Sequence, residues 1–187
     1  MKKGLALIAF CTAFTMGINA QASPIFTHIP LLPAFKGTDE QIAGVVLAVN
    51  SAEIMEARVV LYSFLYSLSK VVSDYAKEML DDSKLSNFNA VALFKKNNIV
   101  PEDSAMSGDI LSQATDQCSY YVTLNRPDFY KAFSHDQVGS DQSILLALNY
   151  ILIISAKNPE LKATLQQMVS MIQKHLILAD ELEDIFY

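Results

Sequence analysis

Residues 158–187 read NPELKATLQQMVSMIQKHLILADELEDIFY, and this stretch decides the fold. Asn158 and Pro159 supply a helix cap and a first-turn proline, and Glu160 places a negative charge where the helix dipole favours one. Apolar residues then recur every three or four positions, in a series that includes one histidine: Leu161, Leu165, Met168, Ile172, His175, Ala179, Leu182 and Phe186. This spacing predicts an amphipathic helix that runs nearly to Tyr187 and packs against other helices.

Three more long helical segments precede this one. We expect them at residues 38–68, 69–96 and 125–155. Thr38 begins the first with a capping-box pattern, Ser69 is the best N-cap for the second, and Pro127 suits the first turn of the third. Residues 103–124 form a long connection in which we expect a short helix at about 109–122. The sequence therefore predicts an all-α, ferritin-like four-helix bundle in which this connection acts as a crossover or a packed lid.

The first 22 residues have the pattern of a secretory signal peptide. Lys2 and Lys3 precede an apolar core over residues 4–18, and Ala20-Gln21-Ala22 provides the small residues that a signal peptidase accepts. The alternative is a membrane anchor, but the core is shorter than the roughly 20 apolar residues that span a bilayer. We therefore expect cleavage after Ala22 and a periplasmic or secreted chain that is not an integral membrane protein. A proline-containing extended arm at 23–37 and a bundle domain at 38–187 complete the predicted organisation.

The charge balance excludes several partners. Lys2 and Lys3 belong to the leader, so the remaining chain carries 12 basic against 20 acidic residues, a net charge of −8. Phosphate backbones and anionic lipid headgroups repel such a surface, which makes nucleic-acid binding and electrostatic membrane docking unfavourable. Only 18% of residues are charged, which is below the usual quarter, so we expect an exposed apolar patch. The apolar run from Ile144 to Ile154 is expected to combine deep burial with a contact surface.

A few titratable residues fall on the apolar stripes of these helices. Glu53, Glu56, Asp141 and His175 occupy or adjoin core positions, where an unpaired charge is costly. One interpretation is a buried hydrogen-bond cluster that joins Glu56 or Asp141 to His175. The other is a divalent metal site with Glu56, Asp141 and His175 as ligands, and with Glu53 and Asp82 in reserve. The spacing lacks the Glu-x-x-His signature of di-iron bundles, and Cys118 is interpreted as a buried thiol rather than a nucleophile.

Four stretches, taken together in order and spacing, resemble a known family. They are SAEIMEAR at 51–58, YAKEMLDD at 75–82, FYKAF at 129–133, and PELK at 159–162 with KHL at 174–176. The resemblance covers about residues 38–182. It is to the ferritin-like bacterial envelope proteins that share domain of unknown function 4142 and are described as predicted outer membrane proteins.

The resemblance implies a ferritin-like fold and an envelope location, which includes a position peripheral to the outer membrane. Members of the family carry histidines at two positions that here read Ser83 and, with one gap, Asp141, so that only His175 is retained. This loss weakens the case for an enzyme.

These observations lead to three hypotheses about the function of the protein. The leading hypothesis is a non-catalytic envelope protein that binds an envelope protein partner or forms a homo-oligomer. The second is a bundle that binds a metal or another small ligand through Glu56, Asp141 and His175. The third is a ferritin-like oxidase, which needs a paired-metal ligand set that the sequence does not show.

Overall fold

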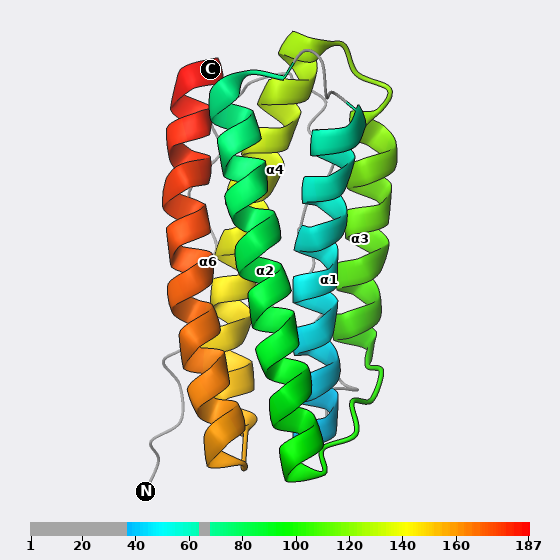
Figure 1. Cartoon of the computed structure of the whole chain (residues 1–187), viewed down its shortest axis with the longest axis vertical. Helices are drawn as coiled ribbons and strands as arrows, with labels where there is room; N and C mark the ends of the chain where they lie inside the picture. Colours follow the sequence, from blue (N-terminus) through cyan, green and yellow to red (C-terminus); the bar gives the residue numbers. More distant parts are fainter. Residues whose placement is uncertain (1–36, 64–67) are drawn as a thin grey trace, which may run out of the picture.

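The computed structural model describes residues 37–63 and 68–187, and within these ranges the chain is helical throughout apart from its short connections. The five main helices are α1 (Asp39–Ser63), α2 (Lys70–Asn97), α3 (Ala105–Tyr121), α4 (Arg126–Ala147) and α6 (Pro159–Phe186). A π-helical turn, η1 (Leu148–Leu152), and a last turn, α5 (Ile153–Ser155), continue α4. The helices stand side by side as a bundle (Figure 1). The predicted signal peptide and all but the last residue of the predicted arm lie outside the described residues.

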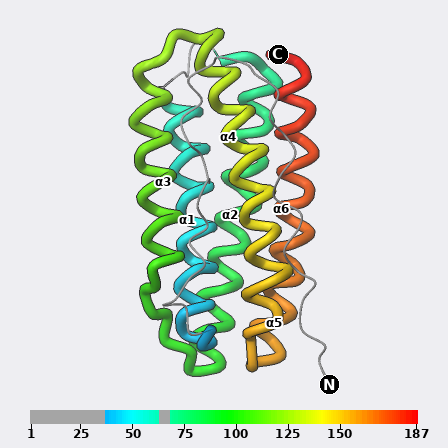
Figure 2. Tube along the Cα trace, turned by 180° about the vertical axis from the view of Figure 1, so that it is seen from behind, coloured from blue at the N-terminus to red at the C-terminus, as the bar shows by residue number. Residues whose placement is uncertain are grey.

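The prediction for the segment between α2 and α4 is corrected by α3. This helix has 17 residues, begins at Ala105, and packs along α1 for most of its length (Figures 1 and 2). Its start is fixed by Ser104 and Ser107, whose side chains each accept a hydrogen bond from the other residue's backbone N–H. A serine in place of the usual Glu or Gln hid this capping box in the sequence. The bundle therefore has five helices, and α3 returns the chain so that α2 and α4 run in the same direction.

The predicted helix starts are largely confirmed. Thr38 and Asn125 each accept a hydrogen bond from a backbone N–H in the first turn that follows, and Asn158 accepts two. Ser69 stands at the predicted N-cap of α2, but its side chain makes no capping bond. Its backbone N–H instead donates to the Tyr130 hydroxyl, 2.8 Å away. The first helix is described as far as Ser63, residues 64–67 lie outside the described ranges, and Leu68, the predicted end, is not helical.

Two apolar clusters fill the bundle, one in each half of its length. The first joins the beginning of α1 to the end of α2, to η1 and to the first half of α6, with Val46, Leu148 and Leu165 among its members. The second joins the end of α1 to the beginnings of α2 and α4 and to the end of α6. Between the clusters, at mid-height, α1, α2, α4 and α6 each contribute at least one buried polar residue. We call this set the polar layer.

A close backbone contact fixes the loop between α2 and α3 against α1. The Glu102 N–H donates to the Glu40 carbonyl at 2.9 Å, and a Cβ added at Gly44 would lie 2.0 Å from the Glu102 carbonyl oxygen. Gly44→Ala must push the loop away, so we expect it to lower the free energy of unfolding by about 1–3 kcal/mol. Thermal unfolding followed by circular dichroism measures this.

Gly108→Ala is the matched control for that substitution. Gly108 is exposed on α3, with nothing within 4 Å of an added Cβ, so alanine should stabilise the protein by about 0.5–1 kcal/mol through helix propensity. Equal effects of the two substitutions would contradict the contact at Gly44.

Candidate functional site

The polar layer lies where the sequence interrupts the apolar stripes. Its buried members are Asn50, Glu53, Glu56, Ser83, Gln137, Asp141 and His175. They come from α1, α2, α4 and α6, because each helix crosses mid-height once. Buried polar groups need partners, and the contacts within the layer divide it into two parts.

The first part is an ion pair at His175. The side chain is fully buried on α6, with Nδ1 3.4 Å from Glu53 Oε1 on α1 and Nε2 3.3 Å from Asp82 Oδ2 on α2. A histidine donates from both ring nitrogens only when it is protonated. Two carboxylates facing the two nitrogens therefore favour an imidazolium, which ties three helices together. The Ser83 hydroxyl adds a hydrogen bond to the second oxygen of Glu53.

The electrostatics of this ion pair agree with its geometry. Burial acts to lower the pKa of His175, but hydrogen bonds and charges from Glu53 and Asp82 outweigh burial and raise it. Burial acts to raise the pKa of Asp82, but Lys174 and His175 outweigh it and lower that pKa. Lys174 lies 2.9 Å from Asp82 and also contacts Glu78, so the ion pair extends to the surface between α2 and α6.

The second part of the layer is acidic and centres on Glu56. Its Oε2 accepts a hydrogen bond from Gln137 Nε2 at 2.7 Å, and the Tyr75 hydroxyl donates to Gln137 Oε1 at 3.3 Å. Burial raises the pKa of Glu56 to about 8, although the Gln137 hydrogen bond opposes the rise. Burial and the charges of Glu53 and Glu56 also raise the pKa of Asp141, whose Oδ2 has no hydrogen-bond partner. This part of the layer therefore favours neutral carboxylic acids.

A small cavity adjoins these acids between α1, α3 and α4. It has a volume of about 30 Å³. Three carboxylates and three glutamine amides are among the groups around it: Glu53, Glu56, Asp141, Gln113, Gln117 and Gln137. The cavity exists because α3 packs along α1 and touches α4 much less.

A third buried acid lies nearby on α4. Asp136 accepts a hydrogen bond from the Tyr121 hydroxyl at 3.1 Å, and burial raises the pKa of Asp136 to about 6. Tyr121, Phe129 and Phe133 pack their rings against one another with centroids 5.7 Å apart. These aromatics form part of the second apolar cluster, and Asp136 provides the partner that a buried tyrosine hydroxyl needs.

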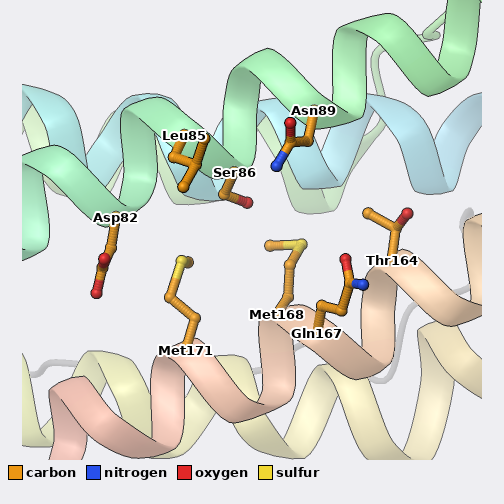
Figure 3. A pocket seen from close by; sticks show the side chains of 8 residues that line it. All are labelled: Asp82, Leu85, Ser86, Asn89, Thr164, Gln167, Met168 and Met171. Carbon is orange, nitrogen blue, oxygen red and sulfur yellow. The ribbon is translucent and has the colours of Figure 1, made fainter.

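A groove opens on the other side of the bundle, between α2 and α6 (Figure 3). It has a volume of about 220 Å³, and Met168 and Met171 extend into it from α6 opposite Leu85 and Ser86 of α2. Asp82 is the ionisable residue among its eight lining residues, and Lys174 and His175 engage that carboxylate. The groove is therefore lined mainly by uncharged and flexible side chains, and its lining contains no pair of residues that could act as general acid and base.

The proposed metal ligands do not gather as a set. Glu56 and Asp141 line the same cavity, whereas His175 pairs with the two residues held in reserve, Glu53 and Asp82. The predicted cluster is thus real, but the histidine partners named for it, Glu56 and Asp141, are wrong. In the part of the chain that the structure describes, no three His, Cys, Asp or Glu side chains are arranged to hold a metal ion. Metal binding through these residues stays a prediction.

Several residues of the site escaped sequence reasoning. Gln113 and Gln117 fall within the short helix expected at 109–122, but the sequence did not show which neighbour α3 packs against, so their faces were not assigned. Asn50 and Asp136 are buried one position away from the residues that define the apolar stripes. Cys118 was interpreted correctly, since it is buried and burial raises the pKa of its thiol to about 12, far from that of a nucleophile.

The surface of α4 differs from the expectation of deep burial. Leu148 and Leu152 are buried, but Leu146, Tyr150 and Ile154 are 51%, 72% and 68% exposed. Among the described residues, Arg126–Ser155 is long and apolar enough to cross a membrane by length and composition, and 17% of its most apolar window is buried. This segment packs along α6 as a bundle helix. The segment therefore exposes apolar side chains, and its burial is much shallower than predicted.

Comparison with known proteins adds one match. A family model described as "Domain of unknown function (DUF4142)" matches residues 32–182. No curated protein and no solved structure matches the chain. The matched residues cover the bundle from before α1 into the last turns of α6 and include every member of the polar layer. This helical chain therefore belongs to the DUF4142 family.

Proposed function

We propose that this chain is an exported, non-catalytic binding protein of the bacterial envelope that associates with a second copy of itself through α4. The observation that carries the proposal is the exposed apolar row of Leu146, Tyr150 and Ile154, which we call the α4 stripe. The three residues are spaced four apart, so they follow one face of the helix. Tyr150 lies within the π-helical turn η1, a local irregularity that is often found at functional sites.

The charge distribution favours a second copy as the occupant. Residues 142–155 include no Asp, Glu, Lys or Arg, although the chain as a whole is acidic. Two acidic molecules repel each other across most of their surfaces, and an uncharged face allows them to approach. A two-fold axis would place each α4 stripe against its counterpart, as in most homodimers. The ordered helix under the stripe lowers the entropy cost of binding.

The envelope location and the ferritin-like relationship are parts of the same proposal. The leader at 1–22 supports export, and the resemblance supports a periplasmic protein or one peripheral to the outer membrane. In ferritin-like bundles, one long crossover joins the second and third helices. Here α1, α2, α4 and α6 would form the quartet, with α3 as a helical crossover. Fractionation of cells that make the full chain tests the location, and a cytoplasmic chain of unprocessed mass would contradict it.

Tyr150→Glu is expected to convert the associated protein to monomer. A charge at the centre of each α4 stripe would face its symmetry-related copy without a partner, and a lone buried charge costs several kcal/mol. Size-exclusion chromatography with light scattering gives the mass of wild type and variant. Phe88→Glu is the control, because Phe88 is an equally large apolar residue that is 73% exposed on α2, outside the α4 stripe. A wild type that is monomeric at all concentrations, with no crosslinked neighbour in cells, would contradict the proposal.

A further inference from the structure

Unpartnered polar atoms gather at the cavity between α1, α3 and α4. The described residues contain six buried side-chain N or O atoms without a hydrogen-bond partner. Three of the six belong to residues that line this cavity, namely Asp141 Oδ2, Gln113 Nε2 and Gln117 Nε2. Asp141 is 2% exposed, so water from the surface cannot readily satisfy its oxygen. Buried polar atoms are rarely left unpaired, and their concentration at one cavity points to an occupant.

The charge around the cavity indicates the sign of that occupant. Glu53, Glu56 and Asp141 all line it, and none of its lining residues is basic. The two oxygens of Glu53 face His175 and Ser83, so the cationic His175 is paired with Glu53. Glu56 bonds the neutral Gln137 instead, and neither Glu56 nor Asp141 has a cationic partner. An anion would meet three carboxyl groups and no basic side chain, so the lining of the cavity favours a cation.

The volume of the cavity and the chemistry of its donor atoms narrow the class of ligand further. About 30 Å³ holds one or two water molecules or a dehydrated ion, and it is too small for an organic ligand. Carboxylate and amide oxygens are the ligands of hard divalent cations, and a glutamine amide turned about its last bond presents oxygen instead of nitrogen. Mg²⁺ demands near-ideal octahedral geometry and gives up its waters reluctantly, so carboxylates combined with rotatable amides suit Ca²⁺ or Mn²⁺ better.

We propose that this cavity binds one hard divalent cation, Ca²⁺ or Mn²⁺, through the carboxylates of Glu56 and Asp141 and the amides of Gln113 and Gln117. The proposed ligands are two carboxylates and the neutral amide oxygens of two glutamines. Such a site does not need three or more His, Cys, Asp or Glu ligands, an arrangement that is absent from the described residues. His175 takes no part, since its two nitrogens face Glu53 and Asp82. The site joins α3 to α4, two helices that otherwise share few contacts. It is independent of the proposed self-association.

The test measures stability and bound metal together. The processed protein, purified without a metal-affinity tag, is unfolded thermally in chelator and then in Ca²⁺ or Mn²⁺, with choline chloride matching the ionic strength. Wild type should bind about one equivalent in equilibrium dialysis. Its Tm should rise by roughly 5–10 °C when free cation exceeds the dissociation constant about 100-fold.

Asp141→Asn separates the cation site from a structural role. Because the Asp141 carboxyl has an unpartnered oxygen, the variant should be at least as stable as wild type in chelator, yet it should lose the cation-dependent rise in Tm. Asp136→Asn is the matched control, a buried acid on the same helix that bonds Tyr121 and does not line the cavity, and it should keep the full rise. Absence of saturable binding in wild type, or equal binding by Asp141→Asn, would overturn the proposal and leave water as the occupant.

Discussion

Raising the pH from 5 to 8 should lower the free energy of unfolding by roughly 3 kcal/mol or more, and Tm by roughly 6–12 °C. A main cause is Glu56, whose pKa burial raises from 4.5 to about 8. Between these two values the unfolded chain releases the Glu56 proton while the folded protein keeps it. Each pH unit in this window therefore costs about 1.36 kcal/mol of stability.

The other buried groups of the polar layer act in the same direction. The pKa of Asp141 is raised, as that of Glu56 is, so Asp141 also loses stabilising free energy as the pH rises. The pKa of Asp136 is raised from 3.8 to about 6, so Asp136 adds to the loss of stability between these two pH values. The pKa of His175 is also raised, so its contribution is complete below pH 6.5 and is lost as pH rises through the folded value. Asp82 has a lowered pKa, so its stabilising contribution is lost only at acidic pH and is already fully present throughout the range from pH 5 to 8.

Glu56→Gln provides the control for this pH dependence. Glutamine can still accept the Gln137 hydrogen bond, yet it has no proton to lose, so the variant should show a flatter profile and exceed wild type at pH 8. Thermal unfolding from pH 5 to 8, in chelator so that no cation competes for the acids, measures both curves. A wild type that becomes more stable toward pH 8, or a variant with an unchanged slope, would contradict the assignment of a neutral Glu56.

The second large effect is expected at His175. Replacement by alanine leaves the buried Glu53 without its cationic partner and opens a cavity at the centre of the bundle. Breaking a buried ion pair from one side typically costs about 3–5 kcal/mol. His175→Ala should therefore lower stability by that amount, as measured by urea unfolding at pH 6, where the wild-type imidazole is protonated.

Removal of both partners distinguishes lost charge pairing from lost packing. The double variant Glu53→Met with His175→Leu places apolar groups of similar volume between the two apolar clusters, and such replacements are often neutral or stabilising. We expect it to recover most of the stability that His175→Ala loses. A double variant no more stable than the single one would show that the ion pair is not the reason for the loss.

The fold was largely predictable because capping residues and prolines in the sequence mark where most of the helices begin. Asn125 and Asn158 cap helices that begin with proline, and these caps form as expected. The helix α3 was underestimated because its capping box uses two serines and its buried face includes polar residues such as Ser107 and Gln117. Shallow burial of the run from Ile144 to Ile154 was also hidden, since composition alone does not show which side of a helix meets its neighbours.

The site was predictable in its members and less so in its pairing. Apolar periodicity placed Glu53, Glu56, Asp141 and His175 in the interior, where all four are found. Their pairing depends on the relative rotation and height of helices far apart in the sequence, which periodicity does not contain. Asp82 reaches His175 from the rim because α2 packs beside α6 there. The amides of α3 could be assigned only after that helix was placed.

Sedimentation equilibrium of the processed protein, at several concentrations and at low and high salt, tests the self-association most directly. An uncharged α4 stripe on an acidic chain predicts a dimer whose dissociation constant falls as salt rises, because salt screens the repulsion between copies and leaves apolar contact intact. A monomer under all conditions, or a dimer that salt dissociates, would contradict association through α4.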